Sequence, residues 1–275
     1  MKMPSRVLTI AGSAAGGSAG IQADLKTFQE LDVYGMSVVT ALVAKHPDTK
    51  KNVHLQTIEA IEAQFATAVE QVGVDTIKVG MLFSKEIIVA VAKLIEQSSV
   101  QHVVVDPVMI GKMNSRLLAE DAIESLQEKL LPLATIMTPN MPEASLLLGG
   151  RTLTHVEDLK KAAVDLWKLG SKAVLVKGGR LSGPAVDVLY DGSSVTTFEV
   201  PRINTEHTSG AGCTYSAAIT ANLSKGSSIE KSIRSAKEFV STAIEHGFSY
   251  TNVVGPTYHA GLRKQGLAYK VKVEK

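Results

Sequence analysis

Residues 209–214 read Ser-Gly-Ala-Gly-Cys-Thr and precede a run of small residues, 215–223, that is typical of a helix. Closely spaced glycines expose backbone N–H groups, and a helix N-terminus carries a partial positive charge, so an anion such as phosphate is favoured here. Cys213, the only cysteine, stands in the first helical turn, where the same field favours its thiolate. The segment predicts an anion hole beside a candidate base or nucleophile. A tight glycine turn with Cys213 as a small buried apolar residue is the alternative.

A second glycine-rich segment, residues 12–20, follows a short apolar run and contains four glycines among nine small residues. Because no large side chain stands in the way, its backbone could lie close to a flat ligand. The segment has neither the Gly-Lys-Ser/Thr end of a Walker A loop nor a complete dinucleotide-binding pattern. A flexible turn is the alternative reading.

Carboxylates and an amide follow predicted strands or turns. Asp24 comes one helical turn after Gly20, and Asp106 ends an apolar run. Asn140 and Glu143 are three residues apart, so they share the first turn of a helix if one begins at Pro142. Their oxygens are of the kind that holds Mg²⁺ and its waters around phosphates. A surface charge for Asp24 and a helix-start charge for Glu143 are the alternatives.

Lys177 ends a run of small and apolar residues, 173–177, directly before Gly178 and Gly179. A lysine at the end of a buried strand could approach a nucleotide phosphate. It could equally extend its ammonium group to solvent.

Short β-branched runs alternate with segments of helical period along the chain. We expect strands at residues 7–10, 36–43, 76–79, 102–106 and 173–177 and helices at 22–31, 58–72, 85–97, 119–130, 158–169, 215–223 and 229–246. Residues 186–190 and 195–200, joined across Asp191-Gly192, have the pattern of a β-hairpin. The alternation predicts an α/β three-layer sandwich with a mostly parallel central sheet, helices on both faces and the antiparallel hairpin at one edge. We expect residues 1–275 to form a single domain, with its ligand at the carboxyl ends of the strands.

Composition excludes several classes of function. A formal net charge of +2 with dispersed Lys and Arg gives no patch for nucleic acid or an acidic membrane. One cysteine excludes an intrachain disulfide and a cysteine-based zinc cluster, and it fits a reducing compartment. No apolar run approaches the 18 or so residues of a membrane span, and residues 7–11 are too few for a cleavable signal. We therefore expect a cytoplasmic protein that binds neither nucleic acid nor membrane.

The order of these motifs resembles the ribokinase-like superfamily of small-molecule kinases. It is most similar to the branch that phosphorylates hydroxymethyl groups on vitamin heterocycles. The matching stretches, which span nearly the whole chain, are residues 10–13, 20–28, 80–82, 106–109, 138–140, 177–179, 210–214 and 254–257. The resemblance implies an ATP-dependent kinase that uses Mg²⁺, with ATP over the carboxyl edge of the sheet and, as in relatives, a homodimer.

The resemblance also implies a role for each residue of the site. Cys213 takes the place of an aspartate base, and Gly210, Ala211 and Gly212 hold the transferring phosphoryl group through backbone N–H groups. Asp106 and Glu143 hold Mg²⁺, partly through water, with the help of Asn140. Lys177 and Gly179 line the nucleotide site, and Lys112 is a mobile cation that covers the phosphates. The substrate ring lies near Gly20, Asp24, Lys45, Met81 and Val108.

Two sister activities share these motifs, pyridoxine/pyridoxal kinase and hydroxymethylpyrimidine kinase of thiamin synthesis. Residues 43–48 resemble the pyridoxal type in their Pro-Asp portion, and Lys45 can donate but not accept a hydrogen bond where the pyrimidine kinases commonly have glutamine. Ala211 and residues 254–259 also favour the pyridoxal type, whereas Pro142 and residues 116–118 resemble the pyrimidine kinases. A vitamin B6 kinase is our prediction, a hydroxymethylpyrimidine/phosphomethylpyrimidine kinase is the alternative, and a non-catalytic ligand-binding relative is the third.

Two positions depart from the pattern of these kinases. Ala14 stands where the first glycine loop usually has an aspartate, which removes a charge from that loop. Gly111 stands where some pyridoxal-type members carry a lid cysteine, so a thiol that could trap an aldehyde substrate is missing.

Overall fold

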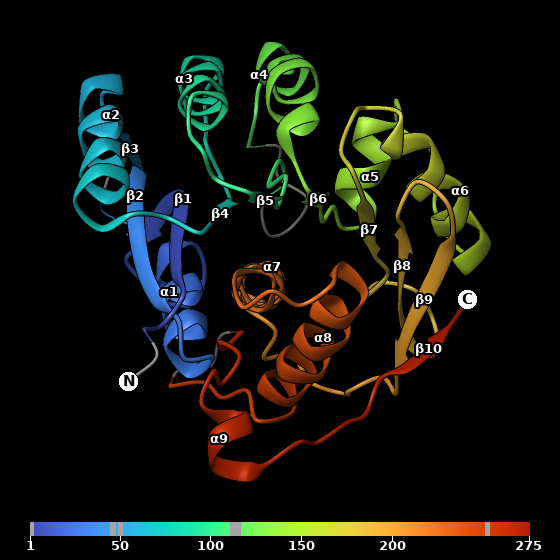
Figure 1. Ribbon diagram of the computed structural model, residues 1–275. Coiled ribbons are helices and arrows are strands. Elements are labelled where there is room, and N and C mark those ends of the chain that lie inside the picture. The colour runs from blue at the N-terminus through green and yellow to red at the C-terminus, as the bar shows by residue number, and fades with distance from the viewer. Residues whose placement is uncertain (1–2, 45–47, 49–51, 111–116, 251–253) are drawn as a thin grey trace.

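A ten-stranded sheet runs through the part of the chain that the computed structural model describes, residues 3–44, 48, 52–110, 117–250 and 254–275 (Figure 1). Its order is β10-β9-β8-β7-β6-β5-β4-β1-β2-β3. The strands are β1 (Arg6–Ala14), β2 (Tyr34–Val43), β3 (Val53–Leu55), β4 (Thr76–Val79), β5 (His102–Val105), β6 (Ile136–Met137), β7 (Val174–Lys177), β8 (Ala185–Tyr190), β9 (Val195–Val200) and β10 (Lys272–Glu274).

The centre of the sheet is parallel and both of its ends are antiparallel. Strands β2, β1, β4, β5, β6 and β7 pair in parallel, so their carboxyl ends share one edge. The predicted hairpin is confirmed as β8 and β9, and the Asp191 carboxylate accepts N–H bonds from Ser193 and Ser194 in its turn. Strand β10 pairs with the outer side of this hairpin and β3 pairs with β2, so short antiparallel strands form both edges.

Helices cover both faces of the sheet, as expected (Figure 1). One layer contains α1 (Ile21–Glu30), α7 (Ala211–Ser224) and α8 (Ile229–Glu245), with α9 (Gly261–Gln265) beside α8. The other layer contains α2 (Ile58–Ala66), which continues as the π-helical η1 (Thr67–Val72), then α3 (Lys85–Glu96), α4 (Glu120–Ser125) with η3 (Leu126–Leu130) and η4 (Leu131–Leu133), α5 (Met141–Leu147) and α6 (Val156–Trp167). No helix in the described ranges is long and apolar enough to cross a membrane.

The apolar core lies on both sides of the sheet because successive strand residues face opposite layers. In β5, Val103 and Val105 pack in the cluster beneath α3 and α6, whereas Val104 packs in the cluster beneath α7 and α8. All three valines are buried, so the strand is apolar throughout rather than alternating, as expected for a parallel strand covered on both faces.

Two element boundaries at the site differ from the predicted ones, because β1 ends later and α7 begins earlier. Strand β1 continues through Gly12 and Ser13 to Ala14, paired with β2 after a register shift at Gly12, so the first glycine-rich segment begins as strand. Helix α7 begins at Ala211 with Gly210 as its N-cap. Cys213 therefore occupies the first turn of α7, as predicted.

Candidate active site

The turn that enters α7 is held in place by contacts on two sides. Gly210 has φ +84°, and a Cβ there would lie 1.7 Å from the Ser18 carbonyl oxygen, so only glycine fits. Ser209 donates its N–H to Gly255 O (3.1 Å) and accepts the Thr257 N–H (3.2 Å), while its hydroxyl donates to Ser18 Oγ (2.9 Å). The start of α7 is therefore clamped between the first glycine-rich segment and the chain near residue 256.

The N–H groups at the start of α7 are not equivalent. Ala211 donates to Thr208 O (3.1 Å), so its N–H is already engaged, unlike in the predicted anion hole. Gly212 and Cys213 follow as the second and third helical residues, whose N–H groups have no acceptor within the helix. Gly210 has no side chain to cap them, and Gly212 is exposed. These two N–H groups are the donors that the helix presents to an anion.

The thiol of Cys213 is half-buried. Burial has the largest effect on the pKa of Cys213 and raises it, as do the charges of Asp24 and Asp106. Lys78 and a hydrogen bond from the Gly20 N–H lower the pKa, but the net change is a rise. The pKa of the thiol is raised in the protein without ligands because desolvation outweighs the positive neighbours.

A buried ion pair lies close enough to this thiol for both of its charges to change the pKa of Cys213. Lys78 Nζ is 2.9 Å and 3.0 Å from the two Asp24 carboxylate oxygens, and Thr9 Oγ1 donates to one of them at 2.6 Å. Asp24 has no exposed surface. Its carboxylate therefore lies inside the protein, so the alternative of a surface charge is wrong.

Asp106, at the end of β5, and Lys177, at the end of β7, meet at the carboxyl edge of the sheet. Lys177 Nζ donates to Asp106 Oδ1 at 2.7 Å, and Thr138 (3.2 Å) and Ser216 (3.1 Å) donate to the same carboxylate. Burial lowers the pKa of Lys177, but Asp106 and Glu143 raise it by more, so its ammonium stays charged. A Cβ on Gly212 would lie 3.5 Å from that ammonium, which places Lys177 at the start of α7.

Asn140 and Glu143 form the N-terminal capping box of α5. Asn140 Oδ1 accepts the Glu143 N–H (3.0 Å), and Glu143 Oε2 accepts the Asn140 N–H (2.8 Å). The helix begins at Met141, one residue before Pro142, and the predicted shared turn is confirmed. Burial raises the pKa of Glu143 to about 7; Lys177 lowers it, whereas the nearby Asp106 raises it.

The donor set around Glu143 fits Mg²⁺. Asp106 and Glu143 are two buried carboxylates close enough for the charge of one to raise the pKa of the other. Such like-charge repulsion is relieved by a divalent cation, and Mg²⁺ commonly binds through one or two carboxylates plus waters and substrate phosphates.

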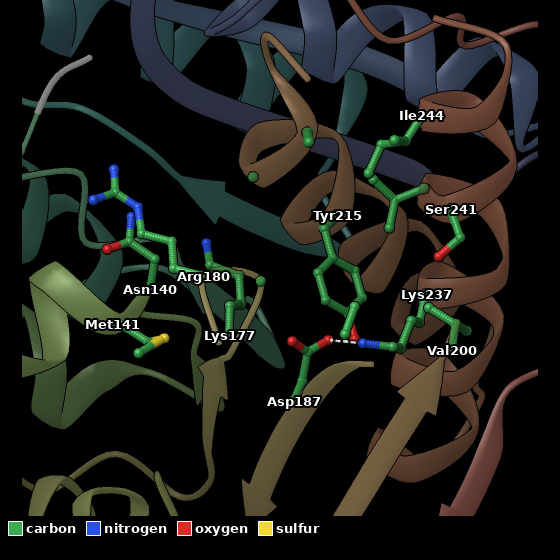
Figure 2. A pocket seen from close by; sticks show the side chains of 15 residues that line it. Asn140, Met141, Lys177, Arg180, Asp187, Val200, Tyr215, Lys237, Ser241 and Ile244 are labelled. Atoms are coloured by element: carbon green, nitrogen blue, oxygen red, sulfur yellow. Dashed lines mark hydrogen bonds and ion pairs between the residues drawn. The ribbon is translucent and has the colours of Figure 1, made fainter. Parts of the chain in front are cut away.

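A cleft of about 260 Å³ opens beside Lys177 and Gly212 (Figure 2). Lys177, Asn140 and Arg180 line one side, and the side chains of Asp187, Tyr215 and Lys237 converge from β8, α7 and α8 on the other. The remaining lining residues are Met141, Gly179, Ala185, Val200, Ala211, Gly212, Val240, Ser241 and Ile244. The cleft combines cations near the α7 N-terminus with apolar walls, as a nucleotide requires.

The rear of the cleft contains a second buried ion pair that the sequence analysis missed. Lys237 Nζ is 2.6 Å from Asp187 Oδ2, and Asp187 Oδ1 accepts the Gly178 N–H at 3.0 Å. Arg202 donates to the carbonyls of Gly179 (3.0 Å), Gly183 (2.7 Å) and Leu181, and so fixes the turn after β7. The sequence did contain a signal for both buried ion pairs, namely a charged residue within a predicted strand: Asp187 in β8 and Lys78 in β4.

The three remaining predicted ring contacts follow β1, β4 and β5 at the carboxyl edge of the sheet. Gly20 (φ +60°) ends the first glycine-rich segment, and a Cβ there would lie 2.3 Å from Gly12 O. Met81 and Val108 follow β4 and β5 at the same sheet edge, and both are half-buried. Lys45, Gly111 and Lys112 lie outside the described residues.

Known proteins are similar in sequence to nearly the whole of this chain. A sequence model of the phosphomethylpyrimidine kinase family matches residues 15–258. The pyridoxine kinase of Bacillus subtilis (strain 168) is 46% identical over 262 residues, covering 94% of this chain and 97% of that protein. The hydroxymethylpyrimidine/phosphomethylpyrimidine kinase of the same organism is 42% identical over 264 residues, covering 95% and 97%.

Solved structures of pyridoxal kinases are similar to this chain over nearly its whole length. The ADP complex of Bacillus subtilis pyridoxal kinase superposes with a TM-score of 0.90 at 45% identity, covering 95% of this chain and all of that one. The Staphylococcus aureus pyridoxal kinase in complex with AMP-PCP and pyridoxal superposes with a TM-score of 0.92 at 39% identity, covering 99% of both chains.

Proposed function

The chain belongs to the phosphomethylpyrimidine kinase family, and we propose that it transfers the γ-phosphoryl group of ATP to the 5-hydroxymethyl group of a vitamin B6 vitamer. Pyridoxine, pyridoxal and pyridoxamine are the proposed substrates, and their 5′-phosphates are the products. The chain is an ATP-dependent phosphotransferase like its relatives. The observation that carries the proposal is the position of Cys213 in the first turn of α7, next to Gly212, which lines a cleft that also contains Lys177 and Lys237.

The nucleotide lies in the cleft of Figure 2, with its phosphates towards Lys177 and the start of α7. The Gly212 and Cys213 N–H groups receive the oxygens of the transferring phosphoryl group, where negative charge must be stabilised. The substrate oxygen forms the new P–O bond as the bond to ADP breaks, and ADP leaves with the electron pair. The hydroxyl proton passes to the Cys213 thiolate. Since such transition states are loose, position and charge matter more than a strong base.

Asp106 and Glu143, with Asn140, are the residues we propose to hold Mg²⁺, largely through water. Mg²⁺ held there would supply positive charge against the phosphates of ATP. The ammonium group of Lys177 keeps a positive charge beside the phosphates throughout the transfer. Gly20, Met81 and Val108 line the proposed place of the substrate ring, next to the thiol.

Hydroxymethylpyrimidine or its phosphate is a second candidate substrate. The likeness to a hydroxymethylpyrimidine/phosphomethylpyrimidine kinase at 42% identity favours it specifically.

Two lysines outside the described residues complete the proposed site. We propose that Lys45 contacts the substrate ring and that Lys112 contacts the ATP phosphates.

Three further proposals accompany this assignment. Residues 1–275 are proposed to form a single kinase domain, supported by one sheet that joins β1 to β10. A homodimer is proposed, supported by the exposed apolar side chains of Tyr34, Leu42 and Leu55 on β2 and β3. The single cysteine supports a reducing, cytoplasmic location.

Parallel assays separate the two substrates. Purified protein with Mg²⁺ and ATP is incubated with pyridoxal, pyridoxine or hydroxymethylpyrimidine, and the phosphorylated products are quantified by chromatography. We expect the highest kcat/KM with a B6 vitamer. A higher kcat/KM with hydroxymethylpyrimidine assigns the chain to the second candidate, and the absence of product from all three contradicts both.

A further inference from the structure

We propose that Lys78, held by Asp24, is a positioning residue of the phosphoryl transfer whose buried ammonium stabilises the Cys213 thiolate. This inference rests on the proposed function, because it concerns the group that accepts the substrate proton. It assigns Lys78 and Asp24 to the proton step rather than to binding of the substrate ring.

The geometry places this charge pair between β4 and α1, two elements that pack against α7. The side chains of Lys78 and Asp24 are 1% and 0% exposed, and Thr9 donates to the same carboxylate. Lys78 belongs to β4 and Asp24 to α1, and both elements pack against α7, which carries Cys213. A Cβ on Gly80 would lie 3.0 Å from Lys78 Nζ, so the ammonium reaches the carboxyl end of its strand.

A purely structural role does not explain the pair well. Removing two charges from water is costly, and apolar side chains of similar volume commonly hold a helix on a sheet at least as firmly. A fully buried lysine within a parallel strand therefore points to a use for its charge.

The charge acts on the thiol through the protein interior. After burial, which raises the pKa of Cys213, Lys78 has the largest effect and lowers it. Asp24 on α1 and Asp106 on β5 raise that pKa, and the Gly20 N–H lowers it. In turn Cys213 raises the pKa of Lys78, so the two groups favour each other's charged forms.

The opposing effects of the Lys78 and Asp24 charges therefore set the fraction of Cys213 that is present as thiolate. A substrate alcohol can give its proton only to a thiolate, so this fraction limits turnover below the pKa of Cys213. Lys78 increases the fraction and Asp24 decreases it, while Asp24 also keeps the buried ammonium charged.

The test uses the fact that Cys213 is the only cysteine in the chain. The rate of alkylation by iodoacetamide, measured against pH without substrate, reports the pKa of this thiol alone. We expect Lys78→Met to move the profile to higher pH by about one unit or more, because the neutral side chain no longer favours the thiolate. An unchanged profile, or a move to lower pH, overturns the proposal.

The chain offers a matched control. Lys237→Met breaks the other buried lysine–aspartate pair, whose side chains are 4% and 6% exposed, but that pair lies in the nucleotide cleft. We expect Lys237→Met to leave the alkylation profile unchanged, and a shift as large as that of Lys78→Met contradicts the proposal.

Two further variants cover the case in which Lys78→Met does not fold. Lys78→Arg keeps the charge and should retain the wild-type profile. The double variant Asp24→Asn/Lys78→Met leaves no unpaired charge and should still shift the profile to higher pH, since Lys78 has the larger effect. If no vitamin is phosphorylated but these shifts occur, the proposed function fails while the charge balance stands.

Discussion

Alanine in place of Gly212 should increase stability while it abolishes most of the activity. A Cβ at Gly212 meets only Lys177 Nζ, at 3.5 Å, and the residue has helical backbone in the first turn of α7. Glycine to alanine at such a position stabilises by roughly 0.5–1 kcal/mol, or about 1–3 °C in Tm. The added methyl group, however, stands beside the N–H donors of Gly212 and Cys213. We expect the methyl group to keep the phosphoryl oxygens away from these donors, which lowers kcat by about 10²–10³-fold, as the loss of such a donor does.

Gly210→Ala is the matched control for this prediction. At φ +84° the left-handed backbone alone costs about 1–2 kcal/mol, and the 1.7 Å approach to Ser18 O forces backbone to move, so we expect a loss of more than about 3 kcal/mol. Thermal unfolding and steady-state kinetics on both variants give the answer. Wild-type kcat/KM in Gly212→Ala would refute the placement of the phosphoryl group at the start of α7.

Two further substitutions test the cation site and the nucleotide site. The pKa of Glu143 is about 7 in the folded protein and has its ordinary value in the unfolded chain. The folded state therefore binds the carboxyl proton more tightly, and the free energy of unfolding falls, on the order of 3 kcal/mol, as pH rises from about 4.5 to 7. Glu143→Gln should therefore raise Tm at pH 8 but not at pH 4.5 while it lowers kcat, and an equal change in Tm at both pH values contradicts this account. Arg202→Met should raise the KM for ATP several-fold with little change in kcat, because Arg202 only orders the turn at Gly179; an unchanged KM argues against that role.

Much of the fold could be predicted from the sequence because strand and helix periods alternate clearly. Strands β3, β6 and β10 were missed, since two or three residues carry no period. Strand β6 is held between β5 and β7 by its neighbours rather than by its own propensity.

The site was predictable where a motif has a local cause. Asn140 and Glu143 form a capping box, which depends only on their spacing, and Cys213 lies where the glycine turn places it. By contrast, the burial of Asp24 depends on Lys78, a residue 54 positions away, and no local pattern reveals that pairing. The same holds for the raised pKa of Cys213, which results from packing around the thiol.

The most direct test of the account compares wild-type protein with Cys213→Ala in the ATP-dependent formation of pyridoxal 5′-phosphate. The account predicts product with the wild type and a kcat lower by about 10²–10⁴-fold in the variant, the usual contribution of a positioned base, with the KM for ATP little changed. Equal kcat in the two proteins would contradict the claim that Cys213 accepts the substrate proton. Absence of product from the wild type would contradict the kinase assignment for vitamin B6.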